Sequence, residues 1–206
     1  MKKVAVIGAN GNMGRRYAMI LEQYCGCEVV RVDIDTHSKI DDLVSCDGII
    51  IATPTDNHVE DILHYGMYQK PILCEKPISK DLPRLKRLLN HPNLDLSMIN
   101  QYYFLQLRQF GFRDSDGDSY YHYFKSGADS LAWDCINIIG MADGPIEVSN
   151  DSLIWKCKLN GYDANLCDMD EAYIRNIQLW VKGWRNKDYI YKAHKKVLEY
   201  INDKKS

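Results

Sequence analysis

Three glycines at three-residue spacing are the residues of this sequence whose types best indicate chemistry. Gly8, Gly11 and Gly14 follow a short apolar run at 4–7 and open an apolar-periodic stretch. Glycine permits a tight strand-to-helix turn, close approach of a diphosphate to the backbone, and packing of helix on strand. The free N–H groups that begin such a helix attract phosphate. This variant of the dinucleotide fingerprint predicts a cofactor site at Gly8, Asn10, Gly11, Asn12, Met13 and Gly14.

An acidic residue stands where a ribose-binding carboxylate is expected. Asp33 ends a second apolar run, residues 29–32, about 20 residues past the glycine turn. Its carboxylate would accept hydrogen bonds from the adenosine hydroxyls and repel a 2′-phosphate, which favours NAD and makes NADP the less favoured cofactor. Asp35 adds negative charge, whereas Arg31 on the same strand face could offset part of it. The alternative is an ordinary βαβ unit in which Asp33 is only a turn residue.

Composition and charge exclude several classes of protein. The 206 residues are 46% hydrophobic and 26% charged, which is typical of a chain that builds a packed core. A net charge of −2 without a basic block argues against nucleic-acid binding. No apolar run is long enough for a membrane span, and no secretory segment follows the first residues, so we expect a cytoplasmic protein.

The cysteines and the acidic turn predict no metal site. There are seven cysteines, an odd number at wide spacings, and Cys25 and Cys27 lack a second ligand pair, so structural zinc is not expected. Buried free thiols fit a reducing compartment. Residues 114–118 superficially resemble a calcium loop, but the glycine is misplaced and position twelve is Lys125, so we interpret them as a turn.

The first half alternates strand-length apolar runs with helical patterns, which predicts an α/β Rossmann domain with a doubly wound parallel sheet. The expected strands are 4–7, 29–33, 48–52, 71–74 and 94–99. The expected helices are 12–24, 39–44, a stretch after 56, and 81–89.

The second half has a different pattern, rich in aromatic residues. It predicts strands at 120–124, 146–148 and 153–159 and helices at 131–141, 168–184 and 189–200. Short strands with turn signals between them indicate a smaller α+β domain with a mostly antiparallel sheet. We therefore expect an NAD-binding domain over 1–100 and a second domain over 101–206.

Two further motifs carry a family resemblance. Ala52-Thr53-Pro54 is followed by His58 four residues past the proline, and Glu75-Lys76-Pro77 follows the next strand. With the glycine turn, they resemble the glucose–fructose oxidoreductase, inositol dehydrogenase and rhizopine-catabolism family, Gfo/Idh/MocA. Residues 100–104 are similar to that family's domain junction, so the resemblance covers about half the chain, residues 1–104. It adds these residues to the cofactor site: Thr53, Pro54, His58, Glu75, Lys76 and Pro77.

The resemblance implies NAD(P) binding in the first domain and a sugar or polyol substrate in the second, which often forms the oligomer contact. It places Lys76 beside the reacting carbon. The residues agree, because Lys76 directly follows a strand whose carboxyl end belongs to the ligand crevice, where an ammonium can polarise a carbonyl or stabilise an alkoxide. Without the resemblance, a surface lysine paired with Glu75 or a phosphate would be the preferred interpretation.

The second half departs from the family pattern. Family members are usually longer, and many carry an Asp with a His four residues later. Here Asp129 pairs with Trp133 at that spacing, or Asn137 takes the His position in another register, and neither register has a histidine. Asp134 and Asn137, one helical turn apart, could hydrogen-bond a substrate hydroxyl, so the predicted catalytic residues are Lys76, Asp134 and Asn137.

Three functions from different classes remain open. The leading hypothesis is an NAD(P)-dependent oxidoreductase acting on a sugar-like or polyol substrate. The alternative is a dinucleotide-binding protein that has lost turnover and acts as a sensor or assembly partner. A third is a reductase of another small ring substrate, since dihydrodipicolinate and biliverdin reductases share this architecture. The apolar face expected around Trp155 predicts a homodimer or higher homo-oligomer.

Overall fold

The computed structural model describes residues 1–34, 40–101, 103, 119–122, 132–133, 135–142, 146–149, 156–159, 162–163 and 169–203. Contacts divide the chain into two compact units. The first comprises Met1–Ile99 and Asn176–Tyr191, and the second Asn100–Arg175 and Lys192–Ser206. The division expected from the sequence kept residues 101–206 together, whereas in the structure residues 176–191 belong to the first unit.

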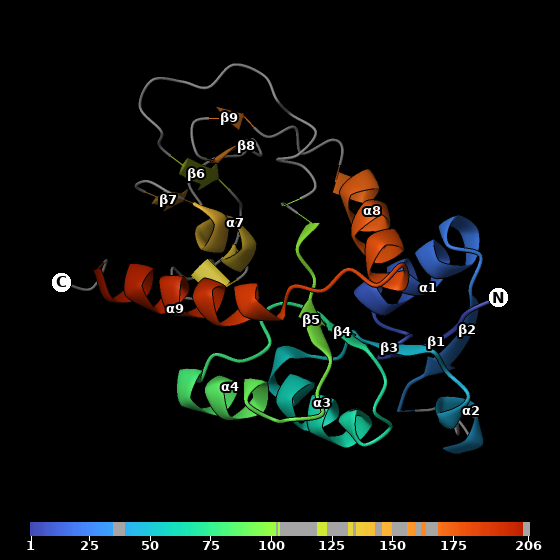
Figure 1. Cartoon of the computed structure of the whole chain (residues 1–206). Coiled ribbons are helices and arrows are strands. Elements are labelled where there is room, and N and C mark those ends of the chain that lie inside the picture. Colours follow the sequence, from blue (N-terminus) through green and yellow to red (C-terminus); the bar gives the residue numbers. More distant parts are fainter. Residues whose placement is uncertain are drawn as a thin grey trace. The chain divides into compact units, whose positions relative to one another are not determined.

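The first unit contains a five-stranded parallel sheet in the order β2-β1-β3-β4-β5 (Figure 1). Its strands are β1 (Lys3–Ile7), β2 (Glu28–Val32), β3 (Gly48–Ile51), β4 (Ile72–Cys74) and β5 (Leu96–Met98). The predicted doubly wound sheet is confirmed, although the fifth strand is shorter than expected. The strand order reverses between β1 and β3, and the carboxyl ends of strands at such a point form the ligand crevice of α/β sheets.

Continuous apolar runs form the central strands β1, β3 and β4 because helices cover both faces of the sheet there. Every residue of β3 is buried, as are the last four of β1. Helix α1 lies on one face, and α3 and α4 lie on the other (Figure 1). The helical segments of residues 1–99 are α1 (Asn12–Tyr24), α2 (Ile40–Val44), the 3₁₀ turn η1 (Thr55–Asn57), α3 (His58–Gly66) and α4 (Leu82–Leu89).

A later segment of the chain completes the first unit. It contains the end of α8 (Met169–Val181) and the start of α9 (Lys187–Asp203). Trp180 covers the start of β3, where a Cβ on Gly48 would lie 2.7 Å from its ring. The side-chain amide of Asn186 accepts from Met98 N at 2.9 Å and donates to Met98 O at 2.7 Å. The Asn186 side chain thus satisfies the backbone of Met98 on edge strand β5.

The second unit contains a four-stranded sheet in the order β7-β6-β8-β9. Its strands are β6 (Ser119–His122), β7 (Ile146–Ser149), β8 (Lys156–Leu159) and β9 (Tyr162–Asp163). The β6–β7 pair is parallel, and the β6–β8 and β8–β9 pairs are antiparallel, so the expected mostly antiparallel sheet is confirmed. The parts of the predicted strands at 123–124 and 153–155 lie outside the described residues.

Helix α7 (Ile136–Met141) forms part of the predicted helix 131–141, and residues 132–133 are helical as well. Residues 136–140 of α7 are fully buried, and Trp133 lies against His194 of α9 with ring centroids 5.9 Å apart. These contacts form an apolar core for the second unit.

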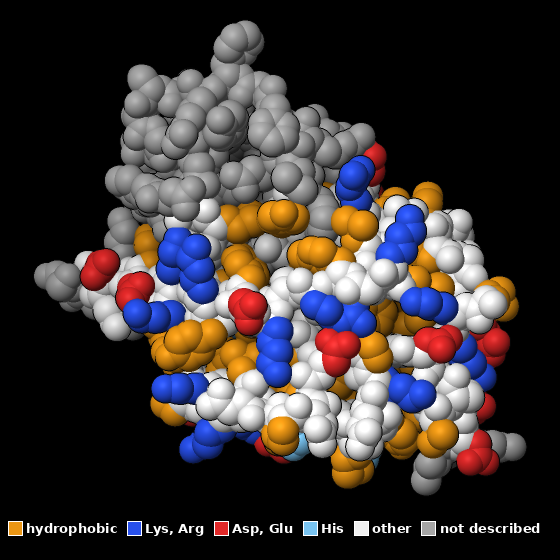
Figure 2. Space-filling model, in the orientation of Figure 1, with side chains coloured by type: hydrophobic (Ala, Val, Ile, Leu, Met, Phe, Trp, Pro, Cys, Tyr) orange, Lys and Arg blue, Asp and Glu red, His pale blue; other side chains and the backbone are white. Residues whose placement is uncertain are grey.

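Charges of both signs are mixed on the surface, as expected for a chain with a net charge of −2. On the face shown in Figure 2, Lys and Arg side chains of the described residues are interspersed with Asp and Glu, and they form no single basic block there. Over the described part of the chain, no helix has both the length and the apolar character needed to cross a membrane.

Candidate dinucleotide site at the strand ends

Two loops meet closely at the point where the strand order reverses. Gly8 follows β1 with φ +79°, and a Cβ there would lie 2.9 Å from backbone atoms of Ala52 and Thr53, which follow β3. A Cβ on Gly14 would lie 2.1 Å from the Gly8 carbonyl oxygen. Both glycines therefore permit backbone contacts that no other residue allows: Gly8 between the two loops, Gly14 between helix α1 and its turn.

Gly11 is less crowded than Gly8 and Gly14, because a Cβ built on it would meet one backbone atom of the described residues. The nearest atom to a Cβ built on it is the Gly8 oxygen at 3.3 Å. Gly11 is the N-cap residue of α1, and no side chain caps this helix start. The first N–H groups of α1, from Asn12 onward, are thus left for a ligand, and a negatively charged group suits both these donors and the helix dipole.

Asp33 lies against the glycine turn, as the sequence predicted. Its Oδ2 accepts a hydrogen bond from Asn10 N at 2.7 Å, and its Oδ1 accepts from Ile34 N at 2.8 Å. A carboxylate has about four acceptor positions, so it can accept further hydrogen bonds from a ribose. Arg31 forms a bidentate ion pair with Glu22 of α1, at 2.7 and 2.8 Å. Asp35 lies outside the described residues.

The Thr53-Pro54 turn is supported by a buried histidine. His58 begins α3 and is 1% exposed, with Nε2 2.8 Å from Thr53 O and Nδ1 2.8 Å from Pro77 O. A carbonyl oxygen only accepts, so a ring N–H of the imidazole donates a hydrogen bond here. Thr53 Oγ1 donates to Asp61 Oδ2 at 2.5 Å. His58 therefore links the loop after β3 to the loop after β4.

Glu75 and Lys76 directly follow β4. Glu75 N donates to Ile51 O at 2.9 Å, which continues the β3–β4 ladder by one residue. The Glu75 carboxylate is buried, accepts from the Tyr17 hydroxyl of α1 through Oε1, and accepts from Lys76 N at 2.8 Å through Oε2. The Lys76 side chain is partly exposed at the same sheet edge as the glycine turn.

The other two predicted catalytic residues belong to the second unit. Asn137 lies on α7, is fully buried, and donates through Nδ2 to Gln101 Oε1 at 3.1 Å. Asp134 lies outside the described residues. The structure thus brings together the predicted residues of the first unit, at the ends of β1 to β4, and shows Asn137 in the packed interior of the second.

These sequence and structural features match known proteins. Residues 21–93 match the Gfo/Idh/MocA model, described as an oxidoreductase family with an NAD-binding Rossmann fold. The resemblance to Gfo/Idh/MocA proteins is confirmed. A stretch of 64 residues, 31% of this chain, is 38% identical to inositol 2-dehydrogenase of Rhizobium meliloti (strain 1021) and covers 18% of that protein. The chain thus matches about a fifth of the length of this curated relative.

Solved structures of dehydrogenases share the fold. A myo-inositol dehydrogenase from Corynebacterium glutamicum ATCC 13032 has a TM-score of 0.71 at 13% identity, over 96% of this chain and 94% of that one. The WlbA (WbpB) dehydrogenase from Thermus thermophilus, solved with NAD and UDP-GlcNAcA, has a TM-score of 0.68 at 12% identity, over 96% and 94%. The NAD-binding Rossmann type predicted from the glycine turn agrees with the family match.

Sequence reasoning missed Tyr17, the residue of α1 that bonds Glu75. The only available signal was a tyrosine on the apolar face of α1, because a buried hydroxyl needs a polar partner. It also missed that His58 is buried, because a histidine at the start of a helix is more often a capping or solvent-facing residue.

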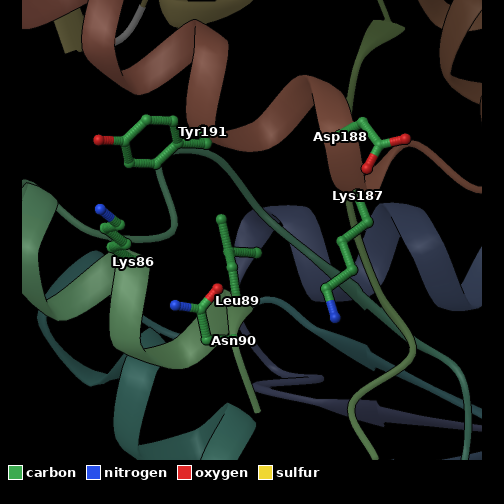
Figure 3. Close-up of a pocket in the computed structure, with 6 residues that line it drawn as sticks. All are labelled: Lys86, Leu89, Asn90, Lys187, Asp188 and Tyr191. Carbon is green, nitrogen blue, oxygen red and sulfur yellow. The ribbon is translucent and has the colours of Figure 1, made fainter. Parts of the chain in front are cut away.

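A separate cavity of about 340 Å³ lies between α4 and the start of α9 (Figure 3). It is lined by Lys86, Leu89, Asn90, Lys187, Asp188 and Tyr191. Of the predicted site residues that the structure describes, none lines it. Among the residues that the structure describes, no group of three or more His, Cys, Asp or Glu could hold a metal ion.

Proposed function

We propose that this chain is an NAD-dependent oxidoreductase that transfers a hydride between the nicotinamide cofactor and a sugar-like or polyol substrate. The observation that carries the proposal is the common sheet edge of the uncapped α1 start, Asp33 and Lys76. The open direction at Gly11 fits a diphosphate, because any other residue would place a Cβ there. The family match of residues 21–93 supports the same reaction class.

Each residue of the first unit has a role in this proposal. The α1 N–H groups bind the diphosphate, and Asp33 accepts from the adenosine ribose. When bound, the nicotinamide supplies the hydride acceptor or donor. When an alcohol is oxidised, Lys76 Nζ takes the hydroxyl proton as the carbon loses its hydride, and in the reverse direction it returns that proton to the carbonyl oxygen. His58 and Glu75, whose polar atoms bond the protein itself, hold the two loops in place.

Cofactor preference follows from Asp33. The Arg31 guanidinium is held by Glu22, which weakens the one local argument for NADP. We expect NADH to bind at least about tenfold more tightly than NADPH, since a 2′-phosphate would face the Asp33 carboxylate. Nicotinamide fluorescence titration measures both affinities, and Asp33→Ala should reduce the difference. Equal affinities in the parent would remove Asp33 from this role.

Turnover tests the function itself. With a panel of cyclic polyols and sugars, we expect NAD reduction by the parent and a kcat lower by about 10²–10⁴ in Lys76→Ala, with NADH affinity nearly unchanged. Lys76→Arg should restore little, because the guanidinium differs in shape and holds its proton. If the parent oxidises nothing and Lys76→Ala weakens NADH binding, Lys76 is a phosphate contact and the protein is a dinucleotide binder.

We also propose a homo-oligomer in a reducing, cytoplasmic setting. The cysteines that the structure describes, at 25, 27, 46, 74 and 135, are free thiols. Light scattering at micromolar concentration should report a species larger than the 23.8 kDa chain. A purely monomeric sample would contradict the assembly proposal.

A further inference from the structure

The buried carboxylate of Glu75 connects two parts of the candidate site that are far apart in sequence. Glu75 is 7% exposed, and a carboxylate at such a place requires hydrogen-bond donors. Tyr17, which is 0% exposed, provides one donor from α1, and the Lys76 backbone provides the other. One side chain therefore bonds both the helix that begins at the glycine turn and the residue expected to act on substrate.

The backbone of Glu75 is fixed independently of its side chain. Glu75 N donates to Ile51 O at 2.9 Å, so the position of its Cα follows from the sheet. The side-chain carboxylate then has one further role, which is to connect the Tyr17 hydroxyl to the Lys76 N–H. Tyr17 lies three residues after Gly14 on the buried face of α1, so its position is set by the same helix whose start meets the ligand.

We propose that Tyr17 and Glu75 form a positioning pair that sets the Lys76 backbone, and with it the Lys76 amine, relative to helix α1. The inference rests on the proposed function for its catalytic consequence. Neither residue touches the substrate in this account. The pair acts through Lys76: it sets the position of the Lys76 amine relative to the cofactor that binds at the start of α1.

Loss of the Tyr17 hydroxyl would release one oxygen of the Glu75 carboxylate. The carboxylate would keep its bond from Lys76 N and turn toward other donors or water, since an undersatisfied buried charge is costly. The Lys76 N–H then loses its fixed acceptor and the amine is misplaced. The N–H groups of α1 that meet the diphosphate are unaffected, so cofactor binding should persist.

Tyr17→Phe is the decisive variant, because it removes one oxygen and keeps the volume that the core requires. Tyr24→Phe is the matched control, since Tyr24 ends the same helix and is 50% exposed. We expect Tyr17→Phe to lower kcat about tenfold with an NADH affinity within about twofold of the parent. The control should leave both unchanged.

A second measurement does not depend on turnover. The rate at which an acyl ester modifies Lys76, followed by mass spectrometry, is compared with that of Lys86, an exposed lysine of α4. Tyr17→Phe should change the Lys76 rate at least about threefold and leave Lys86 unchanged, whereas general loosening of the fold would move both. Glu75→Gln, which keeps an acceptor oxygen, should show a smaller change than Glu75→Ala.

The outcomes separate the two proposals. If Tyr17→Phe leaves kcat and the Lys76-to-Lys86 ratio within twofold of the parent, or moves both lysines alike, the positioning pair is refuted and the bond is only structural. If the parent binds no NADH and oxidises no substrate, yet the ratio still shifts in Tyr17→Phe, the pair stands and the proposed function fails.

Discussion

Gly14→Ala is the substitution whose consequence the structure determines most directly. A Cβ at this position would lie 2.1 Å from the Gly8 oxygen and 2.8 Å from Ala9 Cα, both backbone atoms at the end of β1. No rotamer change can relieve these contacts, because the added atom and its neighbours belong to the main chain. The start of α1 would have to move about 1 Å away from the turn to restore ordinary separations.

The expected magnitude combines two opposing effects. Alanine in a helix interior is favoured over glycine by about 1 kcal/mol. Overpacking that forces the backbone to shift costs about 1–3 kcal/mol and more where neither side can yield. Because α1 packs against both β1 and β2, we expect Gly14→Ala to lower the free energy of unfolding by about 2 kcal/mol.

Gly11→Ala is the matched control in the same turn. Its Cβ would meet only the Gly8 oxygen, at 3.3 Å, so the free energy of unfolding should change by less than about 1 kcal/mol. The added methyl group would occupy the expected place of the diphosphate, so NADH affinity should fall at least about tenfold. Urea unfolding and NADH fluorescence measure the two effects. A Gly14→Ala protein as stable as the parent, or a Gly11→Ala protein with unchanged affinity, would refute this reasoning.

Three further results are expected. His58→Ala should lower the free energy of unfolding by about 2–4 kcal/mol, measured in urea, because the Pro77 and Thr53 carbonyl oxygens lose their shared partner and a cavity remains. Asn186→Ala should cost about 1–3 kcal/mol through its two bonds to Met98, and exposed Asn90→Ala much less. Burial raises the pKa of the Cys25 thiol to about 11, so its alkylation at pH 8 should be about 10–100-fold slower than that of a free thiol and accelerate toward pH 11. Alkylation at the rate of a free thiol would contradict this burial.

The features that could be predicted from the sequence are those that local physics determines. A parallel strand covered on both faces must be a continuous apolar run, so β1 and β3 were predictable from 4–7 and 48–52. A turn that needs positive φ at Gly8 needs glycine. Asp33 could be placed because chain order alone brings the end of β2 beside the turn after β1.

The features that could not be predicted are contacts between distant segments. The periodicity of the sequence indicates that one face of α1 is buried, but it does not indicate which residues pack against that face. The hydrogen bond from Tyr17 to Glu75 therefore could not be predicted. The same holds for Asn186, whose pairing with Met98 joins positions 88 residues apart and brings residues 176–191 to the first unit. Tertiary packing, rather than any local signal, decides these partners.

The backbone itself extends the sheet to the candidate site. Ile7 O accepts from Ala52 N at 2.9 Å, Ile51 O accepts from Glu75 N at 2.9 Å, and Gly8 N donates to Val32 O at 2.9 Å. Each bond continues a ladder one residue past the end of a strand, so the glycine turn, Asp33, Thr53 and Lys76 all begin from fixed backbone positions. The Asp33 carboxylate adds bonds to Asn10 N and Ile34 N, so its replacement removes contacts within the loops as well as a ribose acceptor. Lys76 is placed by its backbone, so a Lys76 substitution can report on turnover while the sheet ladder stays in place. Gly14 and His58 hold the loops together, so their substitution is expected to lower stability.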